Sequence, residues 1–265
     1  MSLTVNTNLS ALNANRNLNQ TSKSLAMAES RLSSGLRINS ASEDVAGYSI
    51  SQALQSQVNG LNQATQNSQD AVSLAQTAQG SLNDVLQMLQ RIRELAVQDA
   101  NGTTSKEGQE SIKGEVTQLE KEIERVGETT SFNGIKLLAG KEAITFQVGA
   151  NDKETIEVKA FELKETIKGL ISVGGAESLT KLTEAIAKVS AAAGEFGAVQ
   201  DRVQYAASNT EVYAQNLQSA VSGITDVNMA AEMTNFTKLQ VLEQAGVSIL
   251  AQANAEPQAV LKLLQ

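Results

Sequence analysis

The stretch from Phe196 to Ile224, FGAVQDRVQYAASNTEVYAQNLQSAVSGI, decides how this chain folds. Nine of its positions are spaced alternately three and four residues apart, and all but one of them are apolar or aromatic. They are Phe196, Val199, Val203, Ala206, Thr210, Tyr213, Leu217, Ala220 and Ile224. This spacing places one narrow apolar stripe along a long helix, which must then pack lengthwise against other helices.

Apolar stripes also mark both ends of the chain. Residues 5–36 carry leucines at helical intervals, and a last helix beyond Val227 carries Met229, Met233 and further apolar positions. The residues between the N-terminal leucines are largely Asn, Ser and Gln, which are mediocre helix formers. We therefore expect the two ends to pair with each other, and the N-terminal segment to stay poorly ordered until a partner covers its leucines.

Two more helices are predicted over residues 43–100 and 104–127. Each begins with capping-box spacing, from Ser40 to Glu43 and from Thr104 to Glu107, and Gly127 is expected to end the second. The first would be about 85 Å long, whereas a compact globule of this chain length is about 50 Å across. The predicted fold is therefore mainly α, an elongated antiparallel bundle of long helices.

The middle of the chain changes its period. Phe132-Asn133-Gly134 is a turn signal, and residues 144–148 and 155–158 alternate between apolar and polar side chains. This pattern predicts a small β-hairpin region over residues 132–160. Helical spacing resumes near Ser178 and continues to residue 224.

Composition excludes several classes of protein. The chain has no Cys, no His and no Trp, so zinc fingers, thiol nucleophiles and Ser–His–Asp triads are excluded. We expect no catalysis, cofactor or metal. A net charge of −8 argues against nucleic acid as a partner. The absence of a long apolar run argues against membrane insertion, and residues 1–12 lack the pattern of a cleavable signal peptide.

Several stretches resemble bacterial flagellin, the subunit of the flagellar filament. They are Arg31–Ala41 (RLSSGLRINSA), Leu89–Gln98 (LQRIRELAVQ), Phe132–Gly134 (FNG), Gln147–Asn151 (QVGAN) and Leu250–Asn254 (LAQAN). The matches lie in order and reach both ends of the chain. The short middle leaves room only for the hairpin region, so the chain resembles a short flagellin with just the two inner, filament-core domains.

The resemblance implies a domain plan. Residues 1–42 and 225–265 would form a terminal coiled-coil domain that lines the filament channel, and residues 43–224 would form a rod domain. The side chains expected to pack in assembly are Leu9, Leu12, Leu25, Leu32, Phe236, Leu239, Leu250, Val260, Leu261, Leu263 and Leu264. Their packing would build the homopolymer that serves swimming motility.

The resemblance also implies partners and a location. Family members leave the cell through the flagellum's own type III export channel and act outside it, so the expected partners are an export chaperone and the cap and junction proteins. Two other interpretations remain open. A hook–filament junction protein shares flagellin-like ends, and a soluble coiled-coil adaptor or secreted effector would form a dimer but no filament.

One further site follows from the resemblance. Arg91, Leu95 and Glu115 match positions that vertebrate flagellin-sensing Toll-like receptors contact, with Gln90 and Gln98 as supporting candidates. The residues alone favour a simpler interpretation. On that interpretation Leu95 is part of a helix seam, and Gln90 and Arg91 belong to a solvated helix face.

Overall fold

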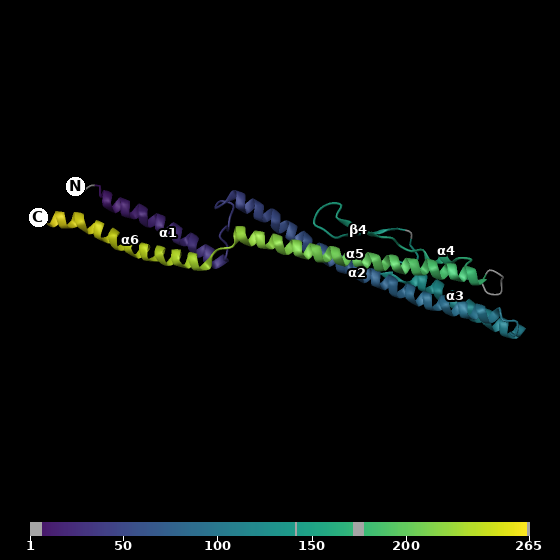
Figure 1. The fold of residues 1–265 in the computed structure, drawn as a ribbon. Coiled ribbons are helices and arrows are strands. Elements are labelled where there is room, and N and C mark those ends of the chain that lie inside the picture. Colours follow the sequence, from purple (N-terminus) through teal and green to yellow (C-terminus); the bar gives the residue numbers. More distant parts are fainter. Residues whose placement is uncertain (1–6, 141, 172–177, 264–265) are drawn as a thin grey trace. The chain divides into compact units, whose positions relative to one another are not determined.

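The computed structural model describes residues 7–140, 142–171 and 178–263, without the side chains of residues 256–263. The described helices are α1 (Leu9–Ser34), α2 (Val45–Asp99), α3 (Lys106–Thr129), α4 (Leu163–Ile167), α5 (Ser178–Thr225) and α6 (Met229–Leu263). The prediction of a mainly α chain with paired ends and a small hairpin region is confirmed (Figure 1).

The chain divides into two compact units. One unit comprises residues 1–56 and 217–265, and the other comprises residues 57–216. We call them the terminal unit and the central unit. The resemblance implies domain boundaries at residues 42/43 and 224/225. The two compact units divide within α2 and within α5, and the expected division into a coiled-coil domain and a rod domain stays a prediction.

Two small antiparallel ladders occupy the middle of the chain. Strands β1 (Ser131–Phe132) and β2 (Ile135–Lys136) flank Asn133 and Gly134, whose φ angles are 48° and 81°. Positive φ at both central residues is what a tight hairpin turn requires, and Asn-Gly is the pair that adopts it most readily. Strands β3 (Ile144–Gln147) and β4 (Thr155–Val158) form the predicted hairpin.

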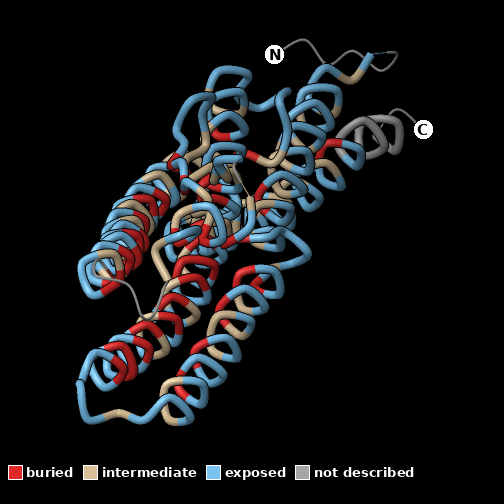
Figure 2. Tube along the Cα trace, turned by 90° about the vertical axis from the view of Figure 1, so that its right-hand side faces the viewer, coloured by how far each residue is buried: buried red, intermediate tan, exposed pale blue. Residues whose placement is uncertain are grey.

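The central unit has a continuous apolar core. Its fully buried side chains come from α2, α3, α4, α5, β4 and the segment before β3, and include Leu82, Leu89, Ile123 and Leu182. Buried positions recur along one side of α2, α3 and α5 in this unit (Figure 2). In α3 the predicted seam is confirmed, because Ile112, Val116 and Ile123 are buried and the intervening apolar positions are half-buried.

The apolar stripe on α5 is confirmed in its first half and shifts in its second. Phe196, Val203 and Thr210 are buried, as predicted. Beyond Thr210, the predicted Tyr213 and Ala220 are exposed, and their neighbours Ala214 and Val221 are buried in their place. An α-helix has 3.6 residues per turn, so a stripe with a strict seven-residue repeat drifts by about 20° per repeat on a straight helix. The buried face of α5 therefore shifts by one residue, from Tyr213 to Ala214 and from Ala220 to Val221.

Thr210 is the one polar position in the stripe, and the structure explains it. Its hydroxyl donates a hydrogen bond to the Val148 carbonyl oxygen at 3.0 Å. The Asn67 side-chain amide of α2 donates to the neighbouring Gln147 carbonyl oxygen at 3.1 Å. The end of β3 and the residue after it are thus held by polar side chains from two different helices.

Both predicted capping boxes are wrong by one or more residues. The N–H of Gly47 donates to Asp44 Oδ1 at 2.8 Å, so Asp44 rather than Ser40 caps the start of α2. The N–H of Gly108 donates to Ser105 Oγ at 3.2 Å, so Ser105 rather than Thr104 caps α3. Glu43, expected to complete the first box, forms an ion pair with Arg31 at 3.1 Å instead.

Gly127 does not end α3, which continues to Thr129. Its role is close packing against α4, a short helix that the sequence did not predict. A Cβ at Gly127 would lie 3.3 Å from Leu163 Cδ2, tighter than an ordinary contact. Leu163 is fully buried, so it has little room to move away.

The terminal unit contains α1, α6 and the adjoining ends of α2 and α5. Figure 1 shows α1 and α6 side by side, running in opposite directions. Among the described residues, no helix combines the length and the apolarity that crossing a bilayer would need.

Candidate assembly and recognition surfaces

Contacts at both ends fix the register of the α1–α6 pair. Beside the start of α1, the Asn8 side-chain amide donates to the Ala253 carbonyl oxygen at 2.7 Å. Beyond its other end, the N–H of Val227 donates to the Gly35 carbonyl oxygen at 3.0 Å. These two bonds align the helices antiparallel over the described length of α1.

The α1–α6 pair buries very little apolar surface. Among its described side chains, only Ala28 and Ala253 are buried. Leu9 is 65% exposed, Val241 60% and Ile249 58%. The other exposed large apolar side chains of the pair are Leu12, Met27, Met229, Met233, Leu242 and Val247. Two helices can cover only one stripe of each other, so apolar residues beyond that stripe remain in contact with water.

We call these exposed apolar side chains of α1 and α6 the terminal apolar surface. Of the predicted assembly residues, Leu9 and Leu12 belong to it. Leu25, Leu32, Phe236, Leu239 and Leu250 are half-buried. Val260, Leu261 and Leu263 are helical in backbone but their side chains lie outside the description, and Leu264 lies outside the described residues. An apolar surface of this kind on a water-exposed helix pair is typical of an interaction site.

The two connectors of the terminal unit pair with each other at their backbones. Leu36, after α1, and Asp226, after α5, form an antiparallel bridge. The N–H of Arg37 donates to the Thr225 carbonyl oxygen at 2.6 Å, and the Arg37 guanidinium donates to the Ile224 carbonyl oxygen. A cation at these last carbonyls is favourable because they form the negative end of the α5 dipole.

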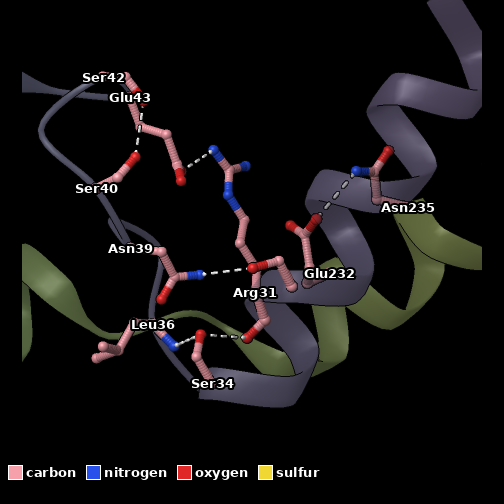
Figure 3. A network of polar contacts seen from close by, with 10 residues as sticks. Arg31, Ser34, Leu36, Asn39, Ser40, Ser42, Glu43, Glu232 and Asn235 are labelled. Carbon is pink, nitrogen blue, oxygen red and sulfur yellow. Dashed lines mark hydrogen bonds and ion pairs between the residues drawn. The ribbon is translucent and has the colours of Figure 1, made fainter.

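Side chains reinforce the same joint, as Figure 3 shows. Arg31 reaches from α1 to Glu43, and the Asn39 side-chain amide donates to Ser30 Oγ at 3.3 Å. The N–H of Leu36 donates to Ser34 Oγ at 3.1 Å. The sequence predicted an extended segment here but missed the roles of Arg31, Arg37 and Glu43, because spacing alone does not show which carboxylate a distant arginine will meet.

The predicted receptor residues lie in the central unit, on α2 and α3. The Arg91 guanidinium contacts Glu115 of α3 at 2.9 Å and Glu94 of its own helix at 3.3 Å. Hydrogen bonds with Glu115 and then Glu94 raise the pKa of Arg91. All three side chains are exposed, so these ion pairs orient the guanidinium more than they stabilise the fold.

The other three candidates divide between surface and core. Gln90 and Gln98 are both exposed. Gln98, seven residues after Arg91, lies on the same side of α2, whereas Gln90, next to Arg91 in sequence, projects about 100° away around the helix. Leu95 is only 2% exposed and belongs to the core of the central unit. On the folded subunit Arg91, Gln90, Gln98 and Glu115 are therefore accessible to solvent, whereas Leu95 packs in the core beneath them.

Long terminal helices with a largely uncovered apolar surface, and a core confined to the central unit, characterise a structural subunit of a larger assembly. The family model of the bacterial flagellin N-terminal helical region matches residues 5–143, and that of the C-terminal helical region matches residues 179–264. The chain therefore belongs to the bacterial flagellin family, whose members are subunits of the flagellar filament.

Individual relatives agree with this family. A flagellin of Halalkalibacterium halodurans is 43% identical, with 98% of this chain and 99% of the relative covered. A flagellin of Bacillus subtilis is 38% identical at the same coverage of both chains. The crystal structure of Bacillus cereus flagellin matches 55% of this chain and 88% of its own with a TM-score of 0.51, at 30% sequence identity.

Proposed function

We propose that this chain polymerises into the flagellar filament for swimming motility, by burying its terminal apolar surface against neighbouring copies of itself. The observation that carries this proposal is the contrast within the α1–α6 pair, where alanines are buried and much larger apolar side chains are exposed. Each Å² of apolar surface removed from water contributes about 25 cal/mol. Ordering the backbone costs about 1–2 kcal/mol per residue. The isolated α1–α6 pair gains little free energy from apolar burial, yet it still bears the full entropic cost of ordering its backbone.

Folding of the terminal helices is therefore coupled to assembly in this proposal. In the free subunit, α1 and α6 open easily and are cut quickly by proteases. In the filament, neighbouring copies cover the terminal apolar surface and the same segments become resistant. The central unit, with its own apolar core, resists proteolysis in both states.

Seeded polymerisation followed by electron microscopy and limited proteolysis tests this proposal. Purified protein should extend filament seeds into long tubes, and cleavage within α1 and α6 should then cease. The double variant L9A/L12A should elongate poorly. Ile135→Ala, which changes an exposed apolar residue of the central unit, is the matched control and should elongate normally. Protein that stays monodisperse beside seeds, with α1 and α6 already protease-resistant, would contradict the proposal.

The same experiment separates the alternatives. A hook–filament junction protein would bind to a filament end without extending it, and a coiled-coil adaptor would form a dimer of fixed size. The flagellin relatives, matched over nearly the whole chain, support the filament subunit.

The location and partners of the subunit belong to the same proposal. The subunit leaves the cell through the flagellar type III export channel, escorted by an export chaperone, and folds at the growing tip in the presence of the cap and junction proteins. The composition supports this route. Without Cys, and with a single Pro, neither disulfide formation nor repeated proline isomerisation would delay folding after export.

We also propose that a host flagellin-sensing Toll-like receptor recognises the monomer at Arg91 and Glu115, with Gln90 and Gln98 beside them. The exposed guanidinium, oriented by two carboxylates, is the observation that supports this role. Charged groups in such a fixed fork geometry are frequent anchors of protein interfaces.

Receptor signalling by purified monomer tests the Arg91 assignment. Arg91→Ala and Arg91→Asp should each raise the monomer concentration for half-maximal signalling by about tenfold or more, the size expected for an interface anchor. Arg125→Ala is the matched control, because Arg125 is also exposed and also pairs with a glutamate three residues away on its helix. An unchanged response to both Arg91 variants would remove Arg91 from the recognition site.

A further inference from the structure

The methionines of this chain are distributed unevenly between its two units. Met27, Met229 and Met233, all in the terminal unit, are 48%, 48% and 50% exposed. Met88, in the central unit, is half-buried and packs against the apolar core. The remaining methionine, Met1, lies outside the described residues. The exposed thioethers therefore belong to the terminal apolar surface.

The antiparallel register brings these three methionines to one end of the α1–α6 pair. Met27 lies two turns before the end of α1, and Met229 and Met233 occupy the first two turns of α6. The bond between Val227 and Gly35 joins the two helices at this same end. Met229 and Met233 are four residues apart, so they share one face of α6.

Among the described residues, these three thioethers are the most accessible sites for a mild oxidant. The chain has no Cys, so no thiol competes for a peroxide. Hydrogen peroxide transfers one oxygen atom to the methionine sulfur: its O–O bond breaks, a sulfur–oxygen bond forms, and water leaves. The sulfur is oxidised by two electrons and the peroxide is reduced by two. Accessible methionines react first, and methionine sulfoxide reductases reverse the change.

Oxidation changes what the terminal apolar surface can bury. A thioether is apolar and packs easily against other side chains. A sulfoxide is polar, and burying it without a hydrogen-bond donor is unfavourable. Three sulfoxides at one end of the pair would put strong acceptors into the surface that must lose water during polymerisation.

We propose that Met27, Met229 and Met233 form a redox-sensitive modification site that controls polymerisation. In the free subunit, oxidation of these residues by peroxide blocks polymerisation and enzymatic reduction restores it. In the filament, neighbouring copies cover the three thioethers and protect them. This inference rests on the proposed burial of the terminal apolar surface, and it adds a chemical regulation to that surface.

Peroxide treatment of the monomer, followed by seeded elongation, tests the proposal. Mass spectrometry of the peptides should show that Met27, Met229 and Met233 gain oxygen before Met88. The lowest protein concentration that supports elongation should rise at least about tenfold, which corresponds to one or more unpaired polar groups buried per added subunit. Treatment with methionine sulfoxide reductases should return it to the starting value. In assembled filaments, the three residues should oxidise more slowly than in the monomer.

Leucine variants identify the residues responsible. The triple variant M27L/M229L/M233L keeps apolar side chains of similar volume. Its own elongation before peroxide is the reference, and peroxide should leave that value unchanged. Met88→Leu is the matched control and should remain as sensitive to peroxide as the native chain. The triple variant keeps Met1, so any inhibition that persists in it would place the sensitive sulfur elsewhere and overturn the proposal.

The outcomes also separate this inference from the proposed function. Untreated protein that fails to elongate on seeds contradicts both. Untreated protein that elongates, together with fully oxidised protein that elongates equally well, contradicts the redox site alone and leaves polymerisation through the terminal apolar surface intact.

Discussion

The central unit and the α1–α6 pair are both built from long helices, yet they differ in what they bury. In the central unit, Leu82, Val85, Leu89 and Ile92 are all 0% exposed, and α3, α4 and the hairpin region complete their surroundings. In the α1–α6 pair, only two alanines are buried among the described side chains. Helical periodicity alone therefore does not make a core. A third layer of structure must cover the stripe, and the described part of the subunit does not supply that layer for the terminal pair.

The largest expected effect comes from truncating the same residue type in the two regions. Leu89→Ala removes a fully buried side chain and should lower the free energy of unfolding by about 2–5 kcal/mol. Leu12→Ala changes an exposed side chain and should alter it by no more than about 0.5 kcal/mol. Urea unfolding of the monomer, followed by circular dichroism, measures both. Equal effects would show that the α1–α6 pair is as well packed as the central unit.

Much of this contrast is present in the sequence. The apolar spacing predicts every long helix, and the alternating segments predict the β3–β4 hairpin. Spacing does not show how many neighbours a stripe will have. The stripe of α1 contains Leu9, Leu25 and Leu32, which look as suitable for a core as Ile112 and Ile123 of α3. Only the fold shows that α3 packs in a core shared with several other elements, whereas α1 packs against α6.

Details that depend on a single partner were the hardest to predict. Ser40 and Asp44 both have side chains that can cap a helix, and the choice of Asp44 depends on where the chain turns after Ile38, which is buried. Gly127 was expected to end α3 because glycine is a common helix terminator. Its actual role depends on Leu163, which lies far along the chain and belongs to a helix too short for a periodic signal.

A smaller effect is expected where the hairpin joins α5. Thr210→Val keeps the shape of the side chain but removes the hydroxyl that donates to the Val148 carbonyl oxygen. The free energy of unfolding should fall by about 1 kcal/mol, the usual net value of one hydrogen bond. Thr183→Val is the matched control, because the Thr183 hydroxyl bonds only within its own exposed helix turn. A loss of equal size in both variants would indicate that the link to the hairpin contributes nothing of its own.

The smallest effect concerns a charge on α3. Burial raises the pKa of Glu120, so the folded chain binds a proton there more tightly than the unfolded chain does. The ionised Glu120 therefore destabilises the fold at pH 7, and this cost disappears as the pH falls through the raised pKa to below the unfolded value of about 4.3.

The variant Glu120→Gln should accordingly raise the midpoint of thermal unfolding slightly at pH 7 and leave it unchanged near pH 4. Glu110→Gln, at an exposed position of the same helix, is the control. A benefit of Glu120→Gln that grew as the pH fell would have the wrong sign and would exclude burial as the cause.

The backbone bridge between Leu36 and Asp226 has a mechanical consequence. Asn8 and Ala253 meet at the opposite end of the α1–α6 pair, so the start of α1 and the last turns of α6 lie at that end. A force that separates these two helix ends would strain the inter-helix contacts one after another, starting beside Asn8, and a small force is enough to separate contacts in sequence. A pull along the axis of one helix would strain all of them together. The helix pair should thus yield readily at its open end and hold firmly under axial load.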